Sequence, residues 1–275
     1  MKKVLGGKMR RSRQFKIWLV LLLICGLLAP PGSSADKQEI IRQAIRAYYN
    51  LPNQGLLEMQ STVVPNWSAI LKEELKTDIP PDHPALKILN GIHFWLSLDQ
   101  KGAAKLTHQT DNTPADKASI EGMNQTISGV EQVLSGFSQT LAPFLFTSPF
   151  PEVESTYELQ DQGEQYRLSY KEGQFDVVTI MKKDFAVIEM KVSGPELSAS
   201  VKPQLTSTPK GFLVTGYQAT YQSGSGTESY QLAVRIDYKE VEGFQVPAKL
   251  GVDATVNGAT HKMELQFTDY QIKKK

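Results

Sequence analysis

Apolar and polar residues alternate strictly along the last third of the chain. Between residues 230 and 238 every second position is apolar, and polar residues or alanine occupy the positions between them. The same alternation continues over residues 244–256 and again over residues 263–267. A period of two places one set of side chains on each face of a strand. The pattern is typical of an antiparallel sheet with one face dry and the other face in water.

Short turns divide this region into strands. Glycine-containing turns at residues 241–243 and 257–258 predict that the three C-terminal runs are successive antiparallel strands. Strand-like runs earlier in the chain predict further strands over residues 55–64, 92–98, 103–108, 157–161, 165–171, 175–181, 185–192 and 212–221. Together these runs give about ten or eleven strands.

Three segments in the first half have helical periodicity instead. Residues 36–50 begin at Asp36, which can cap a helix, and carry apolar residues at helical spacing. Residues 68–77 predict a shorter helix, which is followed by a proline-rich loop at 79–84. The longest helix is expected over residues 116–141, because apolar residues recur every three or four positions. They are Ile120, Met123, Ile127, Val130, Val133, Phe137 and Leu141.

The segment after the long helix is rich in phenylalanine and proline. Residues 144–150 contain Phe144, Phe146 and Phe150, and prolines stand at positions 143, 149 and 151. A proline inside a helix removes a hydrogen bond and collides with the preceding turn. We therefore expect the regular helix to end near residue 141, and residues 144–150 to form a stiff apolar flap.

The order of these elements predicts the fold class. All the expected helices precede Pro151, and most of the strands follow it. This segregation favours an α+β fold, in which helices pack on one face of a large curled antiparallel sheet. A sandwich of two sheets is the competing architecture, although it offers no obvious place for the apolar stripe of the long helix.

The first 35 residues have the features of a secretory signal peptide. Seven Lys and Arg residues come first, an apolar run covers residues 17–28, and the small residues Ser33, Ser34 and Ala35 follow. Cleavage is expected after Ala35, which leaves residues 36–275 as a single domain. Cys25, the only cysteine, lies in the apolar run and is expected to leave with the signal. The alternative is that Cys25 is lipidated and anchors the protein to a membrane.

The rest of the chain is acidic and has no catalytic motif. Without residues 1–35, 23 basic residues stand against 29 acidic ones, which disfavours nucleic acid as a partner. The four histidines, His83, His93, His108 and His261, lack the spacing of metal ligands on a helix. No nucleophile elbow, phosphate-binding loop or dinucleotide fingerprint occurs. We therefore expect a protein that is not an enzyme and has no metal or cofactor.

The C-terminal strands carry motifs of a known superfamily. The segment 234–238 (VRIDY) leads through the turn 241–247 (VEGFQVP) to a final strand that includes residues 265–270 (LQFTDY). Together with the order of the helices and strands before it, this pattern resembles the LolA/LolB-like superfamily of bacterial periplasmic carriers of lipoproteins and lipids. The resemblance implies an unclosed half-barrel of about eleven strands, with two or three helices on its concave face and a hydrophobic cavity between them. It also implies a periplasmic location.

On this basis we expect a monomeric binding protein of the periplasm. It would hold a lipid, a lipoprotein acyl chain or another hydrophobic ligand between the sheet and a helical lid, and deliver it to a partner at the inner or outer membrane. The candidate residues of the cavity and lid are Met123, Ile127, Val130, Phe137, Phe144, Phe146, Met190, Tyr217, Leu232, Val234, Ile236, Val246, Leu265 and Phe267. The alternative function is a non-enzymatic envelope-assembly adaptor with a fully packed core and a partner surface on an edge strand.

Overall fold

The computed structural model describes residues 34–111, 113–114, 116–223, 229–256 and 258–275. The chain divides into two units, residues 1–39 and residues 40–275. The first unit is described over residues 34–39, which begin helix α2 (Ser34–Arg46). Residues 1–33 of the predicted signal peptide, with Cys25, lie outside the described residues. The sheet, the other helices and the core all belong to the second unit.

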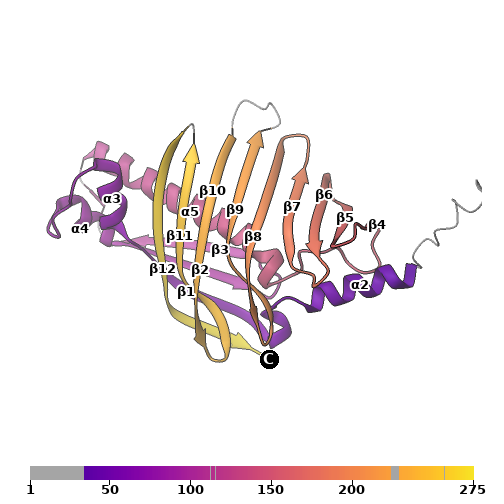
Figure 1. Ribbon diagram of the computed structural model, residues 1–275. Helices are drawn as coiled ribbons and strands as arrows, with labels where there is room; N and C mark the ends of the chain where they lie inside the picture. Colours follow the sequence, from indigo (N-terminus) through magenta and orange to yellow (C-terminus); the bar gives the residue numbers. More distant parts are fainter. Residues whose placement is uncertain (1–33, 112, 115, 224–228, 257) are drawn as a thin grey trace, which may run out of the picture. The chain divides into compact units, whose positions relative to one another are not determined.

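A twelve-stranded antiparallel sheet is the main element of the second unit, over the residues described (Figure 1). Its strands follow the order β3-β2-β1-β12-β11-β10-β9-β8-β7-β6-β5-β4, so β3 and β4 are the edges and the sheet does not close. The strands are β1 (Leu56–Pro65), β2 (Ile92–Asp99), β3 (Ala104–Thr110), β4 (Tyr157–Asp161), β5 (Gln165–Glu172), β6 (Phe175–Lys182), β7 (Val187–Ser193), β8 (Leu197–Thr208), β9 (Gly211–Ser223), β10 (Ser229–Val241), β11 (Phe244–Val256) and β12 (Ala259–Lys274). The predicted α+β class with one large unclosed antiparallel sheet is confirmed.

The alternating C-terminal runs form strands β10, β11 and β12. Val252 of β11 lies opposite Val234 of β10 and opposite Met263 of β12, so apolar residues face one another across three strands. The turn between β10 and β11 is tight, with Glu242 and Gly243 at positive φ angles of 50° and 87°. Positive φ at both central residues is what the favoured two-residue hairpin turn requires. The apolar alternation and the tight turn therefore favour the same pairing of β10 with β11.

One long strand was absent from the sequence-based prediction. Strand β8 contains Pro203 and many serine and threonine residues, so it lacks a clear apolar alternation. It pairs with β9 along its whole length, but with β7 only from Ser198 to Val201. Pro203 lies beyond the last pair with β7, where a missing N–H costs no hydrogen bond on that side. Proline is therefore compatible with this strand.

The N-terminal helix ends earlier than predicted, at Arg46 rather than at residue 50. The chain then pairs with the start of β9. The Phe212 N–H donates to the Ala47 carbonyl at 2.7 Å, and the Tyr49 N–H donates to the Phe212 carbonyl at 2.9 Å. A short parallel bridge joins Tyr48 to Phe212. Tertiary pairing thus replaces the last helical turn that the periodicity predicts.

Two short helices precede β2. Helix α3 (Trp67–Leu75) matches the helix predicted over residues 68–77, and Asn66 caps it by accepting a hydrogen bond from the Ala69 N–H. Helix α4 (Pro84–Asn90) begins at the end of the predicted proline-rich loop and was not predicted. Pro84 occupies its first turn, where proline is tolerated because the N–H there has no helical partner. A single 3₁₀ turn, η1 (Pro52–Gln54), leads into β1.

The long helix α5 (Lys117–Leu145) continues beyond its predicted end. Asp116 caps its first turn, accepting a hydrogen bond from the Ser119 N–H at 2.8 Å. Pro143 lies inside the last turn, so the expectation that this proline region could not be helical was wrong. The three phenylalanines of the predicted flap are only 3–5% exposed, and two of them pack against the ring of Tyr48. Burial of these rings stabilises the last turn of α5, which contains Pro143.

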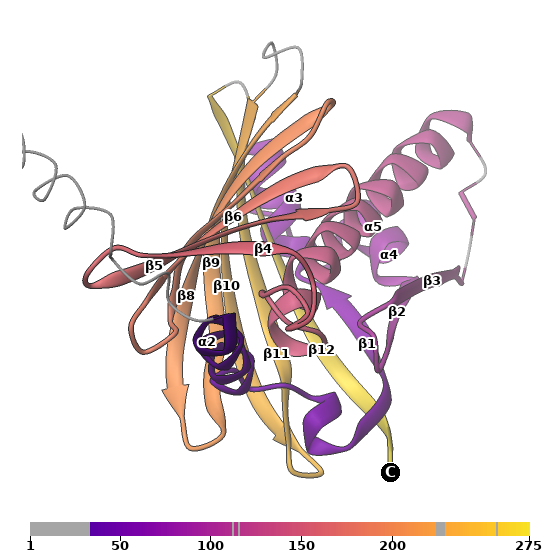
Figure 2. The ribbon, with the colours of Figure 1, turned by 90° about the vertical axis from the view of Figure 1, so that its right-hand side faces the viewer.

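Helix α5 lies across one face of the sheet, which we call the inner face (Figure 2). Its most buried apolar residues recur at helical spacing: Met123, Ile127, Val130, Leu134, Phe137 and Leu141. The ring of Phe137 lies 6.0 Å from that of Phe267 on β12, measured between centroids. The main hydrophobic core therefore lies between α5 and the inner face.

Candidate functional site

A cavity of about 850 Å³ lies between α5 and the inner face of the sheet. Strands β7 to β11 form one wall, the second half of α5 forms the other, and the β5–β6 hairpin contributes two residues. The lining residues are Gly129, Gln132, Val133, Gly136, Phe137, Gln139, Thr140, Pro143, Phe144, Glu172, Phe175, Met190, Val192, Leu197, Ala199, Val201, Tyr217, Tyr221, Tyr230, Leu232, Val234 and Val252. All but four of them are apolar residues, glycine or tyrosine, so the cavity suits a hydrophobic group.

Glycine makes room on the helical wall of the cavity. Gly129 and Gly136 stand seven residues apart and both line the cavity, and Pro143 continues the same spacing. Residues seven apart lie on one face of a helix, two turns from each other. A Cβ atom added to Gly129 or Gly136 would meet nothing within 4 Å. The cavity is therefore open where these positions lack side chains.

The cavity has an apolar floor and a more polar rim. The floor consists of the buried lining residues Phe137, Phe144, Val201, Tyr217, Val234 and Val252. The rim consists of the lining residues with exposed side chains, namely Gln132, Gln139, Glu172, Leu197 and Tyr230. The Tyr230 ring stacks on that of Tyr221, with centroids 4.6 Å apart and an interplanar angle of 13°. A ligand with one apolar and one polar end matches this arrangement.

Tyr217 is the polar member of the floor. Burial raises the pKa of its hydroxyl above the usual value, and a side-chain hydrogen bond with Thr140 of α5 acts in the opposite direction. The hydroxyl is therefore protonated and neutral at physiological pH. Burial also raises the pKa of the Tyr230 hydroxyl, with a further contribution from the neighbouring Tyr221. The tyrosines thus offer neutral hydrogen-bonding groups beside apolar rings.

The structure brings six of the fourteen predicted residues to the cavity and places the other eight in the packed core. The six are Phe137, Phe144, Met190, Tyr217, Leu232 and Val234. The eight, all at most 7% exposed, are Met123, Ile127, Val130, Phe146, Ile236, Val246, Leu265 and Phe267. Phe146, for example, lies against Gly102 in the β2–β3 turn rather than at the cavity.

Sequence periodicity finds packed residues better than cavity residues. An apolar stripe at helical spacing marks the face of α5 that packs against the sheet. The cavity adjoins the neighbouring face, where glycine and polar residues alternate with apolar ones and interrupt the apolar stripe. The repeated glycines at positions 122, 129 and 136 are the feature of the sequence that could have revealed this face.

The histidines do not gather at a site. Three of them pair with carboxylates on different elements: His93 with Asp111 at 3.0 Å, His108 with Glu131 at 2.9 Å and His261 with Glu74 at 3.1 Å. Among the described residues, no group of three His, Cys, Asp or Glu side chains could hold a metal ion. In the same part of the chain, none of the helices has the length and apolar character needed to cross a membrane.

Comparison of the chain with protein-family models, with curated proteins and with solved structures gives no match. The cavity, with its apolar floor and polar rim, is therefore the basis on which a function can be proposed.

Proposed function

We propose that the protein is a non-enzymatic carrier that holds a lipid, a lipoprotein acyl chain or another hydrophobic ligand between α5 and the sheet. The observation that carries this proposal is the apolar cavity of about 850 Å³ on the inner face. Small-molecule sites are typically cavities of about 300–1,000 Å³, lined mostly by apolar side chains with a few polar groups. The floor and rim of this cavity have that composition.

Burial of the apolar part of the ligand supplies the affinity. Each methylene group that leaves water contributes about 0.8 kcal/mol. The loss of translational and rotational freedom on binding offsets part of this gain. The floor side chains are already held by the surrounding core, so binding orders few additional protein groups. An acyl chain can therefore bind without a rearrangement of the core.

The rim offers a route into the cavity. Leu197 and Tyr230 are 37% and 39% exposed, although both carry large apolar groups. Val256, which lies opposite Tyr230 in the adjacent strand, is 44% exposed. Exposed apolar side chains that adjoin an apolar cavity are typical of an interaction site. We propose that the ligand enters between these strand ends and α5.

The motifs that resemble the LolA/LolB-like superfamily support the same class of function. On that basis we propose a periplasmic monomer that is released from residues 1–35 and hands its ligand to a membrane partner. If Cys25 keeps a lipid instead, the same exchange would take place at a membrane surface.

An adaptor for envelope assembly is the alternative function. An adaptor requires a packed core and an exposed edge strand, and the unpaired edges of β3 and β4 would be the places for a partner to join. Unfilled space in a core lowers the free energy of unfolding. A cavity without a ligand would thus be a disadvantage for an adaptor, and its presence favours the carrier.

The first test asks whether the folded protein carries a ligand. The full chain would be exported by a bacterial host, purified without detergent, and analysed by native and then denaturing mass spectrometry. We expect an additional mass that is lost on denaturation and extracts as a lipid. A bare mass that is unchanged after incubation with a mixture of lipids would contradict the carrier and favour the adaptor.

Filling the cavity gives a sharper test. Gly136→Leu places a side chain in the open space beside α5, so Nile red, an uncharged hydrophobic dye, should bind at least about tenfold more weakly. Leucine also favours a helix over glycine by up to about 1 kcal/mol, so the melting temperature should rise. Weaker binding by a more stable protein cannot result from misfolding.

Gly122→Leu is the matched control for this variant. Gly122 lies on the same helix with equally open surroundings, but it does not line the cavity. Its substitution should raise the melting temperature and leave the affinity for Nile red unchanged. The same loss of affinity in both variants, or no loss in either, would show that the dye does not bind in the cavity.

A further inference from the structure

Charge is distributed unequally around the cavity. Among the 22 described residues that line it, Glu172 is the only acidic one, and none is Lys, Arg or His. Helix α5 has one basic residue, Lys117, which is its first residue and lies outside the lining. Along the described parts of both walls, a ligand in the cavity therefore meets no positively charged side chain.

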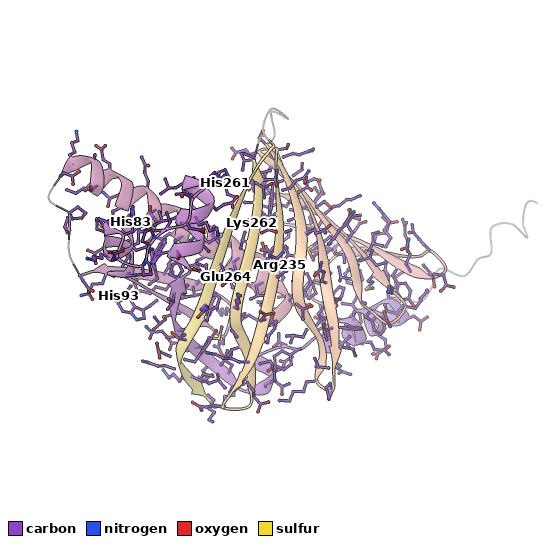
Figure 3. The ribbon with its side chains drawn as sticks, turned by 60° about the vertical axis from the view of Figure 1, so that its left-hand side comes forward. His83, His93, Arg235, His261, Lys262 and Glu264 are labelled. Carbon is purple, nitrogen blue, oxygen red and sulfur yellow. The ribbon has the colours of Figure 1, made fainter. Side chains whose placement is uncertain are left out.

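The two basic residues next to lining residues of β7 and β10 lie on the opposite, outer face of the sheet. Arg235 follows the floor residue Val234, and Lys191 lies between two lining residues of β7, so the period of two directs both away from the cavity. Both are paired there, Arg235 with Asp253 at 3.3 Å and Lys191 with Glu189 at 3.3 Å. Figure 3 labels Arg235 among the side chains of this outer face.

Two further basic residues are close to the lining in the sequence. Lys171 precedes Glu172 at the rim and forms an ion pair with Asp176 at 2.8 Å. Lys202 follows the floor residue Val201, so its side chain is directed to the outer face. Neither one provides a free positive charge inside the cavity.

An anionic head group would be unfavourable in these surroundings. Transfer of a carboxylate or phosphate from water to an apolar site costs free energy unless a cation or several donors meet it. Glu172, the one charged side chain in the described part of the lining, would repel it. The amides of Gln132 and Gln139 at the rim can donate to either kind of head group and can also accept from an uncharged one, so the charge of Glu172 is what distinguishes the two.

We propose that the cavity selects uncharged amphiphiles and rejects amphiphiles with an anionic head group. This inference rests on the proposed carrier function and specifies the chemical class of its ligand. Acyl amides and glycerides belong to the accepted class. Ionised fatty acids and acidic phospholipids belong to the rejected class.

Oleamide and oleate are a matched pair of probes, because they share one chain and differ mainly in the charge of the head group. Displacement of Nile red from the full-length protein would be measured at about pH 8.5, where a free carboxylate is ionised. Both probes would be kept below the concentration at which they aggregate. We expect oleamide to bind at least about tenfold more tightly than oleate.

Two other results have distinct meanings. If oleate binds as tightly as oleamide, or more tightly, the inference on head-group charge is overturned and the carrier function stands. If neither probe nor Nile red binds, the carrier function fails and the inference fails with it.

A basic residue introduced at the rim gives the complementary test. Gln132→Lys should increase the affinity for oleate at least about tenfold, because it adds an attraction for the anion. The affinity for oleamide should not rise, because the same change removes an amide with which an uncharged head group can form hydrogen bonds. Gln125→Lys is the matched control, since it makes the same change two turns earlier on α5, outside the lining. A gain in oleate affinity that is equal in both variants, or absent in both, would overturn the inference.

Discussion

Helix α5 meets the sheet in two different ways along two adjacent faces. On one face, large side chains such as Leu134 and Leu141 are at most 1% exposed and fill the space to the sheet. On the other face, Gly129 and Gly136 leave the space open and the cavity begins. The same helix thus contributes to a packed region and to a hollow one. The difference lies in which side chains are present, since the backbone of both faces is one continuous helix.

The two faces of α5 show how a protein can hold an open apolar cavity. Interiors normally pack as densely as organic crystals, and unfilled space costs free energy. In this protein the packed face of α5 anchors the helix, so the cavity face need not contribute to the core. Apart from Phe137 and Phe144, which belong to both the core and the cavity floor, different residues of the helix contribute to stability and to binding, so substitutions should separate the two properties.

The largest effect is expected on the packed face. Leu134 is fully buried, so Leu134→Ala should lower the free energy of unfolding by about 2–5 kcal/mol, as loss of a buried leucine does in other cores. Urea denaturation followed by circular dichroism would measure this change. Nile red affinity should stay the same under conditions in which the variant is folded, because Leu134 does not line the cavity.

The matched substitution on the hollow side is Val192→Ala. Val192 lines the cavity and is only partly buried, so its truncation removes few packing contacts and should cost less than about 1 kcal/mol. If the two substitutions reduced stability equally, the cavity wall would be packed like the core and the comparison would fail.

A second effect is expected where the packed region joins the β6–β7 turn. The Tyr48 hydroxyl accepts a hydrogen bond from the Val187 N–H at 2.8 Å and donates one to the Phe185 carbonyl at 3.1 Å. Tyr48→Phe leaves both backbone groups without this partner, and Val187 is buried. An unsatisfied buried polar group costs about 1–3 kcal/mol, so the free energy of unfolding should fall by that amount.

Tyr230→Phe is the control in the hollow region. Tyr230 is 39% exposed at the rim, where water can hydrate its hydroxyl. Removal of that hydroxyl should change the free energy of unfolding by less than about 0.5 kcal/mol. A loss as large as that of Tyr48→Phe would indicate that the rim is as ordered as the packed end.

The sequence predicted the sheet well because its information is local. Alternation over residues 230–238 and 244–256 and the turn at Gly243 together define strands and their register. Strand β8 was not predicted, because Pro203 and the polar residues around it leave no apolar alternation in its sequence. It forms a strand because it pairs with β9. Likewise, the N-terminal helix ends at Arg46 because Phe212, far away in sequence, pairs with the next residues.

The candidate site was predictable only in part, for a different physical reason. Apolar periodicity reports where side chains pack, whereas a cavity is defined by side chains that are missing. Phe137 and Val234 were predicted from the apolar pattern, and they also lie in the cavity floor. Gln132 and Gly129 carry no apolar signal, and their place beside the cavity depends on how α5 is rotated on the sheet.

The smallest effect is expected at the start of α5, which both faces share. The pKa of the Asp116 carboxyl is lowered, chiefly by the hydrogen bond from the Ser119 N–H. A carboxylate whose pKa is lower in the folded state contributes stability above its unfolded pKa and loses that contribution as the pH falls through the folded pKa. Asp116→Ala should therefore lower the melting temperature at neutral pH, and the gap to the wild type should close below about pH 4.

Asp116→Asn separates the cap from its charge. Asparagine also caps helices well, so this variant should melt close to the wild type at neutral pH but without the same decline in acid. Thermal melts of the three proteins across the acid range would measure the difference. A gap between wild type and Asp116→Ala that stays constant with pH would show that the charge of Asp116 contributes nothing. Nile red affinity should be the same in all three proteins, because Asp116 lies outside the cavity lining and α5 is held in place by its packed face.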